Sequence, residues 1–148
     1  FGAVQNLMSH LGIWAIRLQV ALLYATAGWY KLSGVHWLEG DALSFVLQVP
    51  FFTHPLAQEW ILPHPIRVQL VTYLVLVFQV VFPVLIWVPK VRPYLLWAGT
   101  FFHLGIVFMV GLADFGLIML VAYLAFSTER NAQGWLKRLG FLGRLQTG

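Results

Sequence analysis

The stretch that decides the fold is VQLVTYLVLVFQVVFPVLIWVP, residues 68–89, which carries no charge between Arg67 and Lys90. A helix needs roughly 20 apolar residues to cross the hydrocarbon core of a membrane. The stretch is long enough to do so, and we expect a membrane span over residues 67–89. Pro83 predicts a kink inside this span, because proline leaves the carbonyl one turn earlier without its helical donor.

Apolar segments lie on both sides of this span. Residues 11–32 are interrupted only by Arg17 and end beside Lys31, and residues 93–112 carry no charge at all. A single helix over 93–127 would be about 50 Å long at 1.5 Å per residue, which is too long for one crossing. Gly111, Asp114 and Gly116 favour a turn there, so we expect separate spans over 93–112 and 113–127.

Composition supports this interpretation. The 148 residues are 60% hydrophobic and 9% charged, with a mean hydropathy of +0.80, which excludes an ordinary water-soluble domain. The absence of cysteine excludes disulfides, thiolate metal sites and thiol nucleophiles. The sequence therefore predicts one all-α polytopic membrane domain over residues 1–148, with four transmembrane helices, an outer loop over 33–65 and a tail over 128–148.

The net charge of +4 indicates orientation and contact with lipid headgroups, and we expect no nucleic-acid partner. With four spans, the N-terminus, the turn at Lys90 and Arg92, and the basic tail share one side. By the positive-inside rule that side is cytoplasmic. We expect an N-in, C-in protein with loop 33–65 outside, most simply in a bacterial inner membrane.

The loop and the tail have different characters. The loop is rich in aromatic residues and proline, and Asp41 is a candidate N-cap for a short helix through Gln48. We expect it to lie at the headgroup level as a lid over the bundle. The tail, with Trp135 and several leucines near one helical face, is predicted to be a basic interfacial segment.

Ionisable residues inside spans are expensive and often functional. Lys31, at the end of the first span, is a candidate general base or nucleophile; alternatively, it extends to the interface from a helix end. His103, in the middle of the third span, is a candidate ligand contact or proton shuttle; alternatively, it is a buried histidine bonded across helices. Glu39 is positioned to pair with Lys31 if the chain turns back after Ser33 and Gly34.

Other polar residues have simpler interpretations. Arg17 is expected to extend to the inner interface, and the glutamines within the spans are expected to bond between helices. His36, His54 and His64 lie in the loop without a tight metal-ligand spacing, so no metal site is predicted.

Two motifs carry a resemblance to a known family. QVALLYATAGWYKL at residues 19–32, followed by Trp37-Leu-Glu39-Gly40, resembles the HTTM (horizontally transferred transmembrane) domain, which includes the membrane part of vitamin K-dependent gamma-carboxylase. His103 and the apolar run after it form a second, weaker match. The resemblance covers most of residues 19–126. A weaker resemblance is to the DoxX-like four-span proteins, which lack the Trp-x-Glu-Gly element.

The HTTM resemblance implies a site. By analogy with the carboxylase, Lys31 corresponds to the base that deprotonates a quinol, and His103 to a helper in the same pocket. Gln19, Tyr24, Trp37 and Glu39 are then ligand-pocket candidates, and the ligand would be a quinone or another lipid. The family's soluble substrate domain has no counterpart in this sequence, so carboxylation is not expected.

Two functions follow. The first, which the sequence favours slightly, is an accessory subunit packed against a larger membrane complex. It is supported by aromatic residues expected on the exterior of the bundle: Phe78, Phe82, Trp87, Trp97, Phe101 and Phe102. The alternative is a membrane-embedded enzyme module that binds a quinone or another amphiphile, with Lys31 as base and His103 as helper.

Overall fold

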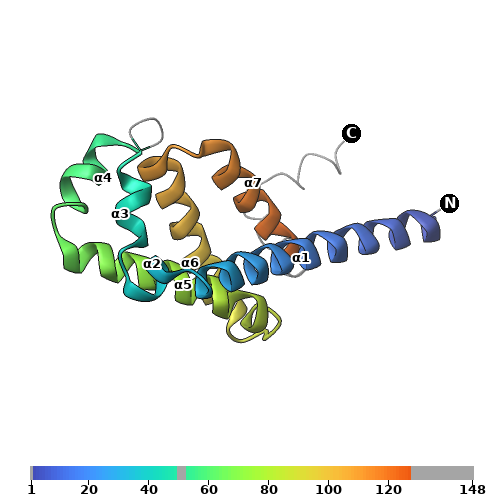
Figure 1. Ribbon diagram of the computed structural model, residues 1–148. Coiled ribbons are helices and arrows are strands. Elements are labelled where there is room, and N and C mark those ends of the chain that lie inside the picture. The colour runs from blue at the N-terminus through green and yellow to red at the C-terminus, as the bar shows by residue number, and fades with distance from the viewer. Residues whose placement is uncertain (1, 50–52, 128–148) are drawn as a thin grey trace, which may run out of the picture.

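The computed structural model describes residues 2–49 and 53–127, with side chains from residue 8 onward, and these residues are almost entirely helical (Figure 1). The predicted interfacial tail lies outside the described residues. The long helices are α1 (Gly2–Leu32), α5 (Pro65–Leu85), α6 (Arg92–Gly105) and α7 (Ala113–Tyr123). Short helices occupy the loop: α2 (Val35–Glu39), α3 (Ala42–Leu47) and α4 (Pro55–Trp60). A π-helical turn, η1 (Ile106–Val110), extends α6, and a 3-10 turn, η2 (Leu124–Phe126), ends α7.

Three of these helices are long and apolar enough to cross a membrane. They cover Met8–Leu32, Pro65–Leu85 and Arg92–Val110, close to the spans predicted at 11–32, 67–89 and 93–112. The fourth apolar helix, Ala113–Phe126, is shorter. At 1.5 Å per residue it is about 21 Å long, against about 30 Å of hydrocarbon, so the fourth crossing stays a prediction.

The turn predicted between the last two apolar helices is present, but Gly116 does not take part in it. Gly111 ends η1 in the left-handed conformation, with a φ of 72°, which glycine adopts without a Cβ penalty. Gly116 is instead inside α7, where it is buried against the carbonyl of His103 and the side chain of Val107. It therefore serves close packing between α7 and α6 and not the turn itself.

The core is aromatic and joins three helices. One cluster contains Val20 and Tyr24 of α1, Phe82 and Ile86 from α5 and its C-cap, and the α7 and η2 residues Met119, Tyr123 and Phe126. Thus Phe82, expected on the exterior, is fully buried, and Phe78, Trp87 and Phe102 pack against the cluster. The reason is helical phase: Phe82 lies on the same face of α5 as the buried Gln79 and Ile86.

The α1 and α5 helices approach closely at Gly28. A Cβ on Gly28 would lie 3.3 Å from the main-chain carbonyl of Gln79. That carbonyl is four residues before Pro83, so it has no helical N–H donor. Gly28 of α1 thus lies beside the backbone carbonyl that Pro83 leaves without a helical donor. Helix α5 continues through Pro83 to Leu85.

The loop is packed onto the bundle. Leu43 and Leu47 of α3 form a second cluster with Ala57 and Val68, and the Leu43 N–H donates to Thr72 Oγ1 at 3.2 Å. The predicted helix after Asp41 is present, but the Asp41 side chain does not cap it. Its carboxylate accepts a hydrogen bond from His36 instead, at 3.0 Å.

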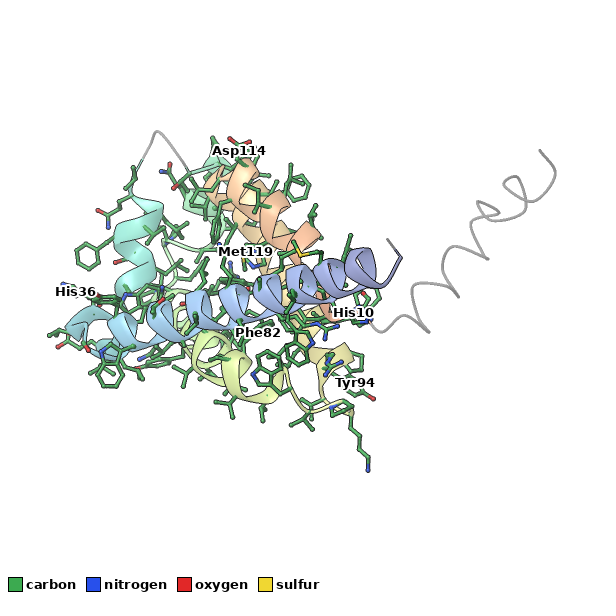
Figure 2. The ribbon with its side chains drawn as sticks, turned by 90° about the vertical axis from the view of Figure 1, so that its right-hand side faces the viewer. His10, His36, Phe82, Tyr94, Asp114 and Met119 are labelled. Atoms are coloured by element: carbon green, nitrogen blue, oxygen red, sulfur yellow. The ribbon has the colours of Figure 1, made fainter. Side chains whose placement is uncertain are left out.

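The two ends of the bundle differ in charge. We call the end formed by α2–α4 and the start of α7 the loop end; it holds every described carboxylate, namely Glu39, Asp41, Glu59 and Asp114. We call the opposite end, with Trp14, Arg17, Trp87 and Arg92, the arginine end. Figure 2 shows His36 and Asp114 far across the molecule from His10 and Tyr94. In Figure 1 the N-terminal part of α1 extends past the other described helices.

Candidate functional site

A buried hydrogen-bonded triad lies at the centre of the bundle. The Tyr24 hydroxyl on α1 lies 2.5 Å from His103 Nε2 on α6 and 2.5 Å from the Tyr123 hydroxyl on α7. The triad therefore ties three helices together through one shared hydroxyl. The family resemblance grouped Tyr24 and His103 in one pocket, and these two residues do meet. The contact matches the alternative interpretation of His103 as a buried histidine bonded across helices.

The triad is enclosed by protein. The exposed fractions of Tyr24, His103 and Tyr123 are 1%, 0% and 5%. The Phe82 ring lies 4.2 Å from the Tyr24 ring, and the Phe115 ring lies 5.6 Å from the His103 ring. A ligand could reach His103 only if the helices moved apart.

Tyr123 reaches the triad because Gly99 lies opposite it. A Cβ on Gly99 would overlap the Tyr123 hydroxyl, so any larger residue would push that ring away. Gly99 and His103 are four residues apart and lie on one face of α6. Sequence reasoning missed both Tyr123 and Gly99. The available signal was the spacing of Gly116, Met119 and Tyr123, which predicts one buried face of α7.

Two buried polar atoms have no hydrogen-bond partner among the described residues. They are His103 Nδ1 and Gln79 Oε1. The expected bond from Gln79 to another helix is thus absent at its carbonyl oxygen. An unpaired polar atom in an apolar interior costs free energy, so these two atoms lower the stability of the folded bundle.

Lys31 occupies a different part of the molecule. Its Nζ lies 4.7 Å from the centre of the Trp37 ring, a cation–π distance, and its side chain is half-buried. The chain turns back after Ser33 and Gly34 as expected, but the described residues contain no ion pair between Lys31 and Glu39. Lys31 lies seven residues after Tyr24 on the same face of α1, about 10 Å further along the axis.

The other pocket candidates are divided between two grooves. Gln19 lines a groove of about 470 Å³ between α1 and α7, and Glu39 lines a groove of about 340 Å³ between α2, α3 and the start of α5. Neither groove is lined by His103 or Lys31. The candidates that sequence analysis grouped together therefore lie in at least three places.

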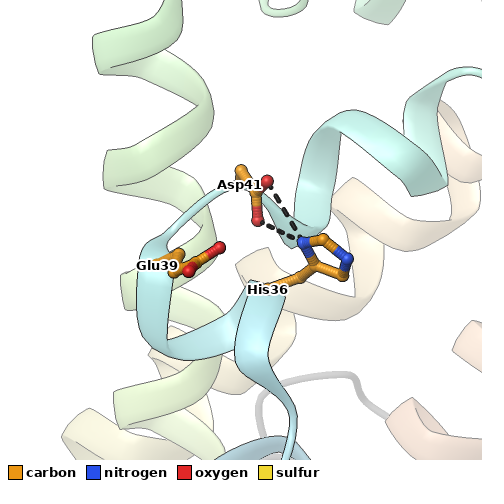
Figure 3. A group of neighbouring side chains, drawn as sticks. All are labelled: His36, Glu39 and Asp41. Carbon is orange, nitrogen blue, oxygen red and sulfur yellow. Dashed lines mark hydrogen bonds and ion pairs between the residues drawn. The ribbon is translucent and has the colours of Figure 1, made fainter.

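Three possible metal ligands meet at the loop end. His36, Glu39 and Asp41 each present one ligand atom, and these atoms lie within 4.8 Å of one another (Figure 3). Sequence analysis predicted no metal site because it considered the histidines alone. His36 and Glu39 are exposed, and the His36 ring is already bonded to Asp41. The existing contact is a surface hydrogen bond that closes the turn between α2 and α3.

These features define an integral membrane protein: a helical bundle with a buried polar centre and long apolar helices that imply contact with lipid. The sequence model of the HTTM domain family matches residues 4–130. The chain therefore belongs to the HTTM family, as the motifs at residues 19–40 predicted. No curated protein and no solved structure matches it.

Proposed function

We propose that the protein is an accessory subunit that packs against another membrane protein through α6. The observation that carries this is a line of exposed aromatic side chains on α6 and η1, which we call the aromatic row: Tyr94, Trp97, Phe101 and Phe108. Their exposed fractions are 75%, 61%, 69% and 64%. Their spacing of three, four and seven residues places them on one helical face.

The position of the row favours a protein contact over a lipid contact. Tyrosine and tryptophan at the ends of spans suit the headgroup region. The row, however, continues along the helix through Trp97 and Phe101, whose rings lie 6.3 Å apart. Aromatic side chains bury much area for little lost entropy and are enriched at protein interfaces. The expected occupant is a transmembrane helix of a partner with small residues facing the row.

The test is size analysis after gentle extraction. Trp97→Leu combined with Phe101→Leu removes the centre of the row but leaves the apolar character of α6. The wild type should migrate in a defined complex, and the double variant should migrate alone with unchanged helix content. Trp29→Leu is the matched control, because Trp29 is 71% exposed on α1, and it should keep the complex. Retention of the complex by the double variant would contradict the proposal.

A second function is favoured by the placement of Lys31. Lys31 lies half-buried at the end of a span with Nζ 4.7 Å from the centre of the Trp37 ring, and its neutral amine form would be positioned to accept a proton from an amphiphile such as a quinol. His103 would act from two helical turns away through Tyr24, its hydrogen-bond partner. In this function Lys31→Ala abolishes turnover and leaves assembly intact, whereas for an accessory subunit Lys31→Ala changes neither assembly nor the activity of the complex.

We also propose an orientation of the protein in the membrane. The arginine end lies toward the cytoplasm and the loop end lies outside, because cytoplasmic loops carry the excess of lysine and arginine. The former holds Arg17, Lys90 and Arg92. The latter holds Lys31, Arg67 and the four described carboxylates, so its described side chains carry a net negative charge. A bacterial inner membrane is the simplest setting for this arrangement.

A further inference from the structure

We propose that the arginine end binds one anionic phospholipid. Its phosphate would lie on Arg17 and Arg92, and one of its acyl chains would lie in the groove between α1 and α7. This site is separate from Lys31 and from Trp97 and Phe101 at the centre of the aromatic row.

Each of the two arginines is anchored to a main-chain carbonyl through its Nε. Arg17 Nε donates to the main-chain carbonyl of Ala125 at 2.6 Å, and Arg92 Nε donates to that of Ile86 at 3.0 Å. Each contact fixes the guanidinium but uses only one of its five N–H donors. Among the described residues, neither arginine has a hydrogen bond or ion pair through its terminal nitrogens. Two guanidinium groups with free donors are suited to the oxygens of a phosphate.

The charges of the described side chains at this end favour an anion. Arg17 lies against the Trp14 ring, which stacks on Trp87, and Arg92 donates to the carbonyl of Ile86, the residue before Trp87. The Trp14–Trp87 stack therefore brings the two positive charges to the same place. The described carboxylates are all at the loop end, so no described acidic side chain neutralises this pair. Like charges in a weakly polar environment interact strongly, so a bound anion would relieve an unfavourable arrangement.

The apolar groove begins where Arg17 is fixed. Its α1 wall contains Ile16, Gln19, Val20 and Leu23, and its α7 wall ends at Ala125, the residue whose carbonyl binds Arg17. Apart from Gln19 the side chains that line it are apolar. The cationic pair therefore continues into a groove that suits an acyl chain, which is the arrangement that a phospholipid requires.

Tryptophan side chains place the arginines at headgroup depth. The Trp14 and Trp87 rings stack with their centres 5.9 Å apart, and the Arg17 guanidinium lies 5.3 Å from the Trp14 ring. Indole rings favour the membrane–water interface, where lipid phosphates are found. The charge complementarity and this depth together favour a lipid over a partner helix or a second copy of the chain.

The test is native mass spectrometry of the full chain, released from nanodiscs that contain equal amounts of phosphatidylglycerol and phosphatidylcholine. The wild type should retain one phosphatidylglycerol in preference to phosphatidylcholine. Arg17→Gln with Arg92→Gln should lower that preference by about tenfold or more, because charge-assisted hydrogen bonds to phosphate are lost. Lys90→Gln is the matched control, since it removes one exposed charge at the same end, and it should retain the preference.

A groove variant separates the acyl chain from the phosphate. Ala122→Phe adds a ring inside the groove and leaves both arginines in place, so lipid retention should fall while the helix content stays that of the wild type. Equal retention of the two lipids by the wild type would overturn the proposal. So would displacement of the lipid by glycerol phosphate alone, which would show that the groove contributes nothing. Detection of a partner helix or of a second copy of the chain bound in place of the lipid would also overturn the proposal.

Discussion

Replacing Tyr24 by phenylalanine removes the one hydroxyl that bonds to two other helices. The ring and its contacts with Phe82 remain, but both hydrogen bonds are lost and His103 Nε2 joins Nδ1 as a buried unpaired atom. Removing a partner from a buried polar group costs about 1–3 kcal/mol. Measured hydrogen bonds between membrane helices average about 0.6 kcal/mol, so the lower half of that range is expected.

Tyr123→Phe is the internal comparison. It removes only the bond from Tyr123 to Tyr24 and leaves the bond between Tyr24 and His103 in place. The expected loss is about 0.5–1 kcal/mol, smaller than for Tyr24→Phe. The double variant should cost little more than Tyr24→Phe alone, because the two residues share one bond.

The assay is reversible unfolding of the purified protein in mixed micelles, followed by circular dichroism, for the two single variants and the double variant. The free energies of unfolding form a double-mutant cycle. If Tyr24→Phe is no more destabilising than Tyr123→Phe, or if the two losses simply add, then the hydroxyl of Tyr24 is not the shared centre of the triad.

Three other predictions concern the packing of the helices and the orientation in the membrane. Gly116→Val should lower the midpoint of thermal unfolding clearly, because a side chain at this buried position meets α6. Gly105→Ala is the control, because the space around Gly105 is open, and it should leave the same melting curve unchanged or shift it slightly upward. Thr72→Val should loosen α3 by removing the acceptor of the Leu43 N–H, and limited proteolysis of the loop should become faster while α5 stays folded. Val49→Cys, in a chain without cysteine, should react with an impermeant thiol reagent from outside intact cells, and reaction only after permeabilisation would reverse the proposed orientation.

The sequence predicted the membrane helices well because their signal is local. An uncharged run of about 20 residues allows few alternatives to a span, and the motif at residues 19–40 identified the family before any geometry was known. The signal for the turn at Gly111 was also local, because the turn needs only one residue that adopts the left-handed conformation. The short helix after Asp41 was predicted for a capping reason that the structure does not show.

The candidate site was predicted less well because its geometry depends on three helices at once. His103 and Tyr24 are 79 residues apart, and nothing local indicates that they meet. Tyr123 and Gly99 were missed because an aromatic residue or a glycine in an apolar helix is ordinary on its own. The position of Lys31 over Trp37, and not beside Glu39, was also undetermined, since an indole ring and a carboxylate are both suitable partners for an ammonium.

Whether the aromatic row is a protein interface can be decided by native size analysis of gently extracted membranes with identification of the co-migrating proteins. The expected result is a defined complex that contains this chain and at least one other membrane protein. The complex should be lost when Trp97 and Phe101 are both changed to leucine and retained in Trp29→Leu. Migration of the wild type alone or as a small homo-oligomer, or a complex unaffected by the double change, would contradict it.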